Sequence, residues 1–179
     1  MWTSLRVGPW TCSRSVSAKG RGSAENTVRG IYPVSAHIAF GANTWATPDG
    51  RRAHEPLSDG VSPKQGLDKH GPVAIMNSVA CLNHGNFSNG TLLNMKFHPK
   101  SVEGENGVLK LQHLVRTFFD KGGMHLQYNV VSSDVLRAAQ RDPEEYKDLV
   151  IRIAGFSAYF VELYKELQDD LISRTDIVM

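Results

Sequence analysis

The sequence has few cysteines, no long apolar run and almost no excess of charge. Two cysteines, Cys12 and Cys81, are too few for a disulfide scaffold or a four-ligand zinc site. No apolar stretch approaches the roughly 20 residues that a membrane-spanning helix needs. A formal net charge of +2 is too small to indicate a nucleic-acid partner. We therefore expect a globular protein of the reducing cytoplasm, with neither membrane nor nucleic acid as a partner.

The common signatures of enzyme sites are also missing. The histidines form no H-E-x-x-H pattern, and we expect no metal site. Neither a Gly-rich dinucleotide fingerprint after a strand, nor a Walker phosphate loop, nor a G-x-S-x-G nucleophile turn is present. Dinucleotide binding, P-loop chemistry and hydrolysis by a serine nucleophile are therefore not supported.

Residues 1–27 differ from the rest of the chain. They are basic and serine-rich, contain no acid before Glu25, and show no helical or strand period. This composition partly resembles a transit peptide, but an atypical, disordered or non-native start fits it better. We therefore base the fold prediction on the chain from residue 28 onward, which is long enough to bury a substantial core.

The first half of this remainder is rich in loops. Residues 30–40 are compatible with a β-strand, although Pro33 would place that strand at an edge or a bend. Residues 47–50 have the composition of a tight turn. Residues 51–71 are polar, without a period, and predict a long loop, which in a compact domain is usually functional or disordered.

The second half has clearer patterns. Apolar spacing predicts an amphipathic helix over 108–119, followed by a glycine pair suited to a helix end. Further elements follow in order: a strand at 126–131, a helix from Ser132 or Ser133 to Arg141, a strand-like run at 149–151, and a last helix from about Tyr159 to Ser173.

Cys81 and Gly155 could each have either a chemical or a purely structural role. Cys81 follows an apolar helical stretch and has no basic neighbour to lower its pKa, so a buried, inert thiol is favoured over a nucleophile. Gly155 stands between the strand-like run and the last predicted helix. By spacing alone, it serves only to allow a turn that other residues would not adopt.

Several motifs, taken together, change this interpretation. The chain from about residue 30 to residue 175 resembles the C-terminal region of glycyl radical enzymes, and its loop is closer to the dehydratase and lyase branch than to pyruvate formate-lyase. The motifs are Thr47-Pro48-Asp49-Gly50-Arg51-Arg52, Leu57-Ser58-Asp59-Gly60-Val61-Ser62-Pro63, Gly90-Thr91-Leu92-Leu93-Asn94, Gln127-Tyr128-Asn129-Val130-Val131 and Arg152-Ile153-Ala154-Gly155-Phe156-Ser157-Ala158.

The resemblance implies that Gly155 carries a backbone radical. A radical centred on Cα favours a planar carbon that a Cβ would crowd, which explains why the residue is glycine. In this family a separate S-adenosylmethionine iron–sulfur activase installs the radical, so no cofactor is expected to be bound to this chain. The radical then generates a thiyl radical on a cysteine, which attacks a small-molecule substrate. The loop around Gly155 would comprise Arg152, Ile153, Ala154, Phe156 and Ser157.

Four further residues receive roles that stay open. Gln127 and Asn129 alternate with Tyr128 along a predicted strand and therefore share one face of it. They either support the radical loop or make hydrogen bonds in the core. Tyr32 and Val34 resemble part of a barrel strand, where they either line the substrate cavity or pack on the core. Within the loop, Arg152 is expected to pair with an acid or a helix C-terminus rather than to touch the substrate.

The resemblance also implies an incomplete enzyme. Relatives are ten-stranded α/β barrels with the thiyl cysteine on an upstream loop, a position that neither Cys12 nor Cys81 fits. The expected fold is α/β, with the last barrel segments and long loops in residues 28–105 and a helix-rich glycine radical domain in residues 106–179. Its partners would be the activase and the missing barrel portion or a full-length enzyme. A free-standing radical carrier that repairs a partner enzyme and an inactive truncated remnant are the alternatives.

Overall fold

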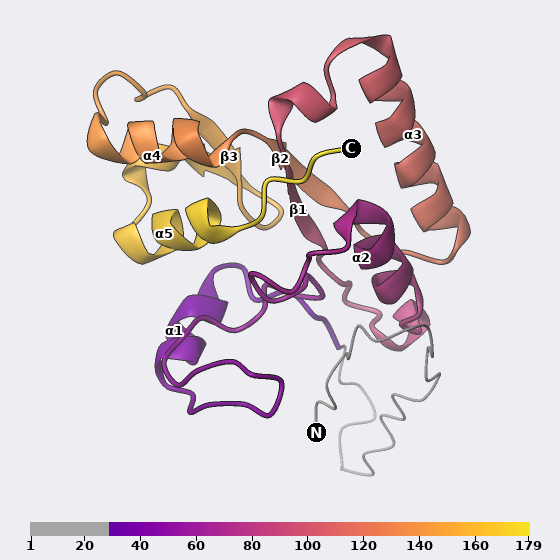
Figure 1. The fold of residues 1–179 in the computed structure, drawn as a ribbon. Helices are drawn as coiled ribbons and strands as arrows, with labels where there is room; N and C mark the ends of the chain where they lie inside the picture. Colours follow the sequence, from indigo (N-terminus) through magenta and orange to yellow (C-terminus); the bar gives the residue numbers. More distant parts are fainter. Residues whose placement is uncertain (1–28) are drawn as a thin grey trace.

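A computed structural model describes residues 29–179, and Figure 1 shows their arrangement. The prediction for residues 1–27, with Cys12, lies outside the described residues. The helices and strands in chain order are α1 (Ala36–Ala42), α2 (Gly71–Ala80), β1 (Asn94–Phe97), α3 (Gly104–Asp120), β2 (Gln127–Val130), α4 (Ser133–Arg141), β3 (Val150–Arg152), β4 (Ser157–Tyr159) and α5 (Lys165–Ser173), with 3-10 turns at His84–Asn86, Pro99–Ser101 and Phe160–Glu162.

A parallel pair of strands, β1 and β2, lies at the centre of the molecule (Figure 1). Helix α3 connects them, and Asn94 is in register with Gln127. The C-terminal tail returns to the other edge of β1, where the Ile177 N–H donates to the Lys96 carbonyl at 2.9 Å. All four residues of β1 are buried, so its side chains alternate between two covered faces.

One face of this sheet is apolar. Met95 and Phe97 point toward α2 and α3, and Phe97 is fully buried. They form the first core cluster with side chains from both helices, the preceding loop and the tail: Val61, Ile75, Met76, Val79, Leu93, Phe118 and Ile177. This half of the fold is held by conventional hydrophobic packing.

The opposite face of the sheet is polar, and a second core lies beyond it. Asn94 and Lys96 of β1 are buried there, with Gln127 of β2. The antiparallel hairpin β3–β4 and helices α4 and α5 cover this face (Figure 1). Their own cluster consists of Ile38, Val131, Leu136, Ala139, Ile151, Ile153, Phe160, Leu167 and Leu171. Two hydrophobic cores are thus separated by a layer of hydrogen-bonding side chains.

The helices of the second half match the sequence patterns well. The helix expected at 108–119 is α3, which begins four residues earlier. Ser132 caps α4, since its hydroxyl oxygen accepts the Val135 N–H at 3.3 Å, and α4 ends at Arg141 as predicted. Gly122 adopts a φ of +92° just after α3, a conformation that favours glycine.

Two predicted elements were wrong. Residues 30–40 do not form a strand: Ile31 makes an isolated bridge to Thr91, Pro33 and Val34 turn the chain, and Ala36 begins α1. The last helix does not begin at Tyr159, because that residue pairs with Val150 in the hairpin. Strand pairing within the hairpin therefore overrides the helical spacing there, and α5 begins at Lys165.

The fold class is mixed α/β, as expected. The described residues contain two two-stranded sheets, whose strands are too few to close a barrel. Strand pairing between β1 and β2 crosses the predicted boundary at residues 105 and 106.

Candidate functional site

Gly155 lies in the loop that joins β3 to β4. The Ile153 N–H donates to the Phe156 carbonyl at 2.9 Å and closes this loop. Gly155 has a φ of +78°, and a Cβ built there would meet no atom within 4 Å. Glycine is therefore required by the backbone conformation and not by crowding inside the described chain. The segment expected to lead from a strand into a helix is instead the tip of a hairpin.

The base of this loop is buried while its tip is exposed. Ile153 is 1% exposed within the second core, whereas Phe156 is 42% exposed and Gly155 and Ser157 are also exposed. Ala154 is partly buried against the second core. The loop is thus anchored on one side and open to another molecule on the other.

Two amide side chains of β2 bind the loop from below. Gln127 donates from Nε2 to the Ile153 carbonyl at 2.8 Å, and its Oε1 accepts the Gly155 N–H at 3.0 Å. Asn129 donates from Nδ2 to the Arg152 carbonyl at 2.8 Å and accepts the Arg152 N–H at 2.8 Å. Both residues lie on the polar face of the sheet, as the alternation of a strand requires.

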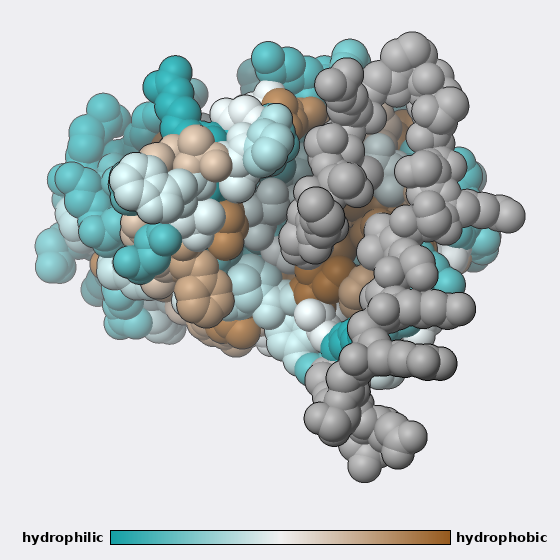
Figure 2. All heavy atoms as spheres, turned by 90° about the horizontal axis from the view of Figure 1, so that it is seen from below, coloured by the Kyte–Doolittle hydropathy of each residue, from teal (hydrophilic) through white to brown (hydrophobic). Residues whose placement is uncertain are grey.

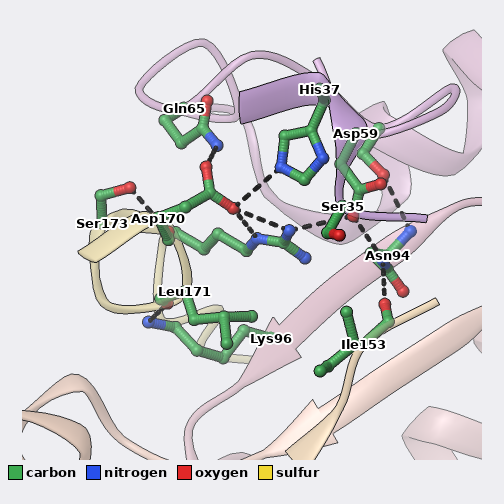
Figure 3. A network of polar contacts seen from close by, with 12 residues as sticks. Ser35, His37, Asp59, Gln65, Asn94, Lys96, Ile153, Asp170, Leu171 and Ser173 are labelled. Atoms are coloured by element: carbon green, nitrogen blue, oxygen red, sulfur yellow. Dashed lines mark hydrogen bonds and ion pairs between the residues drawn. The ribbon is translucent and has the colours of Figure 1, made fainter. Parts of the chain in front are cut away.

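Asn94 completes this arrangement from the neighbouring strand. Its Nδ2 donates to the Ile153 carbonyl at 2.8 Å and also to Asp59 Oδ2, and its Oδ1 accepts from Gln127 Nε2. Figure 3 shows Asn94 between Asp59 and Ile153. Sequence reasoning assigned Asn94 to a family motif but gave it no role.

A buried ionic network continues from Asp59 to the end of α5. Arg174 Nη2 lies 2.9 Å from Asp59 Oδ2 and 2.9 Å from Asp170 Oδ2. His37 Nε2 is 3.3 Å from the same Asp170 oxygen, and Gln65 donates to the other oxygen. Burial raises the pKa of Asp170, but the hydrogen bond from His37 and the charge of Arg174 outweigh this, so the pKa lies below its ordinary 3.8.

A second buried cation lies further along the polar face. Lys96 Nζ contacts Asp176 Oδ1 at 2.9 Å, Ser133 Oγ at 2.8 Å and the main-chain carbonyls of Leu171 and Ile172. Burial lowers the pKa of Lys96 below its ordinary value, and the Asp176 carboxylate opposes that effect. Lys96 thereby joins β1 to the C-terminal end of α5 and, through Asp176, to the tail that follows it.

The remaining predicted residues have less connection to this network. Arg152 was expected to pair with an acid, but within the described chain its Nη1 donates to Ser157 Oγ at 3.3 Å. Tyr32 and Val34 are exposed and belong to neither core cluster of the described chain. Val34 adopts a φ of +63°, a strained conformation for a β-branched residue.

Cys81 corrects another expectation, since it is exposed and not a buried thiol. It follows directly after α2, whose side chains pack on the apolar face of the sheet. The hairpin with Gly155 covers the polar face, so the β1–β2 sheet separates the two residues.

Residues 29–179 contain neither a metal-binding cluster nor a membrane-spanning helix. There, no cluster of three or more histidine, cysteine, aspartate or glutamate side chains could hold a metal ion. Nor does any helix in that range combine the length and apolarity needed to cross a membrane.

Comparison with known proteins decides the family. The family described as "Glycine radical" matches residues 57–161, more than half of the chain. The chain belongs to the glycyl radical family.

Relatives of this family member are dehydratases and lyases. It is 49% identical over 152 residues to isethionate sulfite-lyase from Oleidesulfovibrio alaskensis, covering 84% of this chain and 18% of the relative. It is 44% identical over 146 residues to trans-4-hydroxy-L-proline dehydratase from Clostridioides difficile, with 82% and 18% covered. Its sequence therefore belongs with the dehydratase and lyase branch.

A solved structure extends the likeness to the fold. The B12-independent glycerol dehydratase from Clostridium butyricum, in its glycerol-bound form, superimposes with a TM-score of 0.83 at 51% identity. The match covers 85% of this chain and 19% of that one. The chain thus spans about a fifth of the length of the relatives it matches.

Proposed function

We propose that Gly155 stores a backbone radical for the radical dehydration, or the C–C or C–N bond cleavage, of a small molecule. The main supporting observation is that Gly155 stands at an exposed hairpin tip, in a glycine-favouring conformation, while the buried amide of Gln127 binds both its N–H and the Ile153 carbonyl at the base of the loop. An activase can therefore approach the Cα from outside without disturbing the core beneath it.

The chemistry uses the main chain of this loop. Removal of a hydrogen atom from the Gly155 Cα leaves an unpaired electron shared with the flanking amide nitrogen and carbonyl. The S-adenosylmethionine iron–sulfur activase supplies the oxidising radical, and this chain supplies placement of the carbon. The loop residues Arg152, Ile153, Ala154, Phe156 and Ser157 set the conformation and surroundings of that carbon.

The thiyl cysteine lies outside the described residues in this proposal. Cys81 caps helix α2, which packs on the face of the sheet opposite to the hairpin of Gly155, so we assign the thiyl radical to another cysteine. A full enzyme would therefore combine this chain with an upstream barrel portion that carries the cysteine. Residues 28–105 would supply the last segments of a ten-stranded α/β barrel, with Tyr32 and Val34 at the cavity wall, and residues 106–179 the glycine radical domain.

The exposed apolar side chains favour such a partner. Large hydrophobic side chains that are two-fifths or more exposed occur on α1 and its following loop, on α3 and around the hairpin. They include Phe40, Trp45, Val108, Leu109, Phe119, Val150, Phe156 and Tyr159. On the side seen in Figure 2, apolar surface is interspersed with hydrophilic surface. In the proposed full enzyme these side chains would lie against the barrel portion, which would cover them.

Electron paramagnetic resonance tests the radical directly. The chain, mixed with its barrel partner, is incubated without oxygen with an activase, S-adenosylmethionine and a reductant. We expect a doublet, because one hydrogen remains on the Gly155 Cα, and complete loss of the doublet in Gly155→Ala.

Gly122→Ala is the matched control. Gly122 also has a positive φ and no neighbour near a built Cβ, so its substitution strains the backbone in the same way. The doublet should persist in this variant. A doublet that survives Gly155→Ala would contradict the proposal, as would no signal with an activase that activates a full-length relative.

A further inference from the structure

Asn94 occupies the junction between the charged network and the loop of Gly155. It is 6% exposed, and its side-chain amide makes contacts to three different segments: the loop at Asp59, strand β2 at Gln127, and the hairpin at Ile153. These partners are separated from it by 35, 33 and 59 residues in sequence. We propose that Asn94 is a positioning residue that orients Gln127 toward the Gly155 N–H.

Two acceptors fix the direction of the Asn94 amide. An ionised carboxylate and a main-chain carbonyl accept hydrogen bonds and donate none. Asp59 Oδ2 and the Ile153 carbonyl therefore both require the Nδ2 end of Asn94. The Arg174 guanidinium holds Asp59 in place at 2.9 Å. The Oδ1 end of Asn94 must then face Gln127.

The direction is passed on to Gln127. Asn94 Oδ1 and the Ile153 carbonyl both accept from Gln127 Nε2, the latter at 2.8 Å, so Asn94 adds a second acceptor that keeps the Nε2 end of Gln127 on this side. This leaves Gln127 Oε1 as the acceptor for the Gly155 N–H at 3.0 Å. Hydrogen bonds thus run in one direction from Gly155 through Gln127 and Asn94 to the Asp59 carboxylate. Aligned bonds in a buried chain strengthen one another.

This direction matters for the proposed radical, on which the inference rests. A carbon radical next to an amide is stabilised when the nitrogen donates electron density to it. A hydrogen bond from the N–H to an oxygen acceptor makes the nitrogen a better donor. Asn94 would therefore hold the loop in place and also favour the radical form of Gly155, although it touches neither the Cα nor a substrate.

The test measures the Gly155 N–H itself. The full chain is labelled with ¹⁵N-glycine, which gives signals from 16 glycines, and the signal lost in Gly155→Ala belongs to Gly155. We expect Asn94→Ala to speed hydrogen exchange of the Gly155 amide by about tenfold, the change expected from loss of one hydrogen bond. With activase, the same variant should give less of the radical doublet.

Gln168→Ala is the matched control. Gln168 is 8% exposed, and its amide also donates to two main-chain carbonyls, those of Phe160 and Leu163, at 3.0 Å each. Its loss should lower overall stability to a similar degree without a selective effect on Gly155. If Asn94→Ala does not fold, Asn94→Ser decides the question in the same comparison, because the serine hydroxyl leaves one hydrogen-bonding group at the buried position.

The outcomes separate this inference from the proposed function. Equal exchange of Gly155 in the Asn94 and Gln168 variants would overturn the role of Asn94 and leave the radical assignment intact. Selectively faster exchange, combined with no doublet in the unaltered chain, would support the positioning by Asn94 and overturn the radical assignment. Hydrogen exchange of the Gly155 amide requires no radical, so the exchange result and the doublet can be interpreted independently of each other.

Discussion

The two faces of the β1–β2 sheet hold their neighbours in different ways. Met95 and Phe97 attach α2 and α3 through apolar packing, whereas Asn94 and Lys96 attach the hairpin, α5 and the tail through hydrogen bonds and ion pairs. Apolar contact is non-directional, while hydrogen bonds fix orientation. The hydrogen bonds of the polar face thus position the loop of Gly155. The apolar packing on the opposite face stabilises the sheet that carries these hydrogen bonds.

The largest expected effect tests the apolar face. Phe97→Ala removes a fully buried ring between β1 and the first core cluster, and should lower the free energy of unfolding by about 3–5 kcal/mol. Thermal unfolding followed by circular dichroism measures this. Phe40→Ala, the same substitution at a side chain 62% exposed, should change stability by much less. Equal losses would show that the apolar face carries no special share of the stability.

The second test breaks the polar face. Arg174→Met leaves the Asp59 and Asp170 carboxylates buried without their shared partner, and should lower the free energy of unfolding by about 3 kcal/mol. Arg137→Met is the control, because the Arg137–Asp134 pair is exposed and contributes about 0.5 kcal/mol or less. Denaturant titration measures both. A loss for Arg174→Met no greater than the control would refute a structural role for the network.

The smallest expected effect is a dependence on pH. The native pKa of Asp170 lies below its ordinary 3.8, so this carboxylate contributes stability above about pH 4. That contribution is lost as the pH falls through the lowered native pKa. The difference in unfolding free energy between the unaltered chain and Asp170→Asn should therefore shrink as the pH falls from 5 to below about 4. A difference that stays constant on acidification would contradict this.

The sequence predicted the elements whose stability is local. Helix α3 has a regular apolar spacing and α4 has a serine cap before it and a proline after it, so both were found nearly complete. The hairpin was missed because the pairing of Tyr159 with Val150 depends on a turn at Gly155 that spacing alone cannot distinguish from a strand–helix connection. The helix at Ala36–Ala42 was missed because Val34 adopts a conformation that its side chain disfavours.

The site residues also divide into those that a local pattern predicts and those that only the tertiary fold brings together. Alternation along β2 placed Gln127 and Asn129 on one face, and the motif resemblance directed attention to Gly155. Asp59, Asn94 and Arg174 could not be connected from the sequence, since they come from three segments that only the tertiary fold brings together. The strongest available signal was the presence of polar residues at alternate positions of a buried strand, at Asn94 and Lys96.

The alternation within β1 leaves little tolerance for changes in chain length. All four residues of this strand are buried, and neighbours in sequence belong to opposite layers. A deletion or insertion of a single residue would turn the Phe97 ring toward the polar face of the sheet. It would turn the Asn94 amide or the Lys96 ammonium group toward the apolar face. Length variation in this part of the family should therefore be confined to the segments before Asn94 and after Phe97.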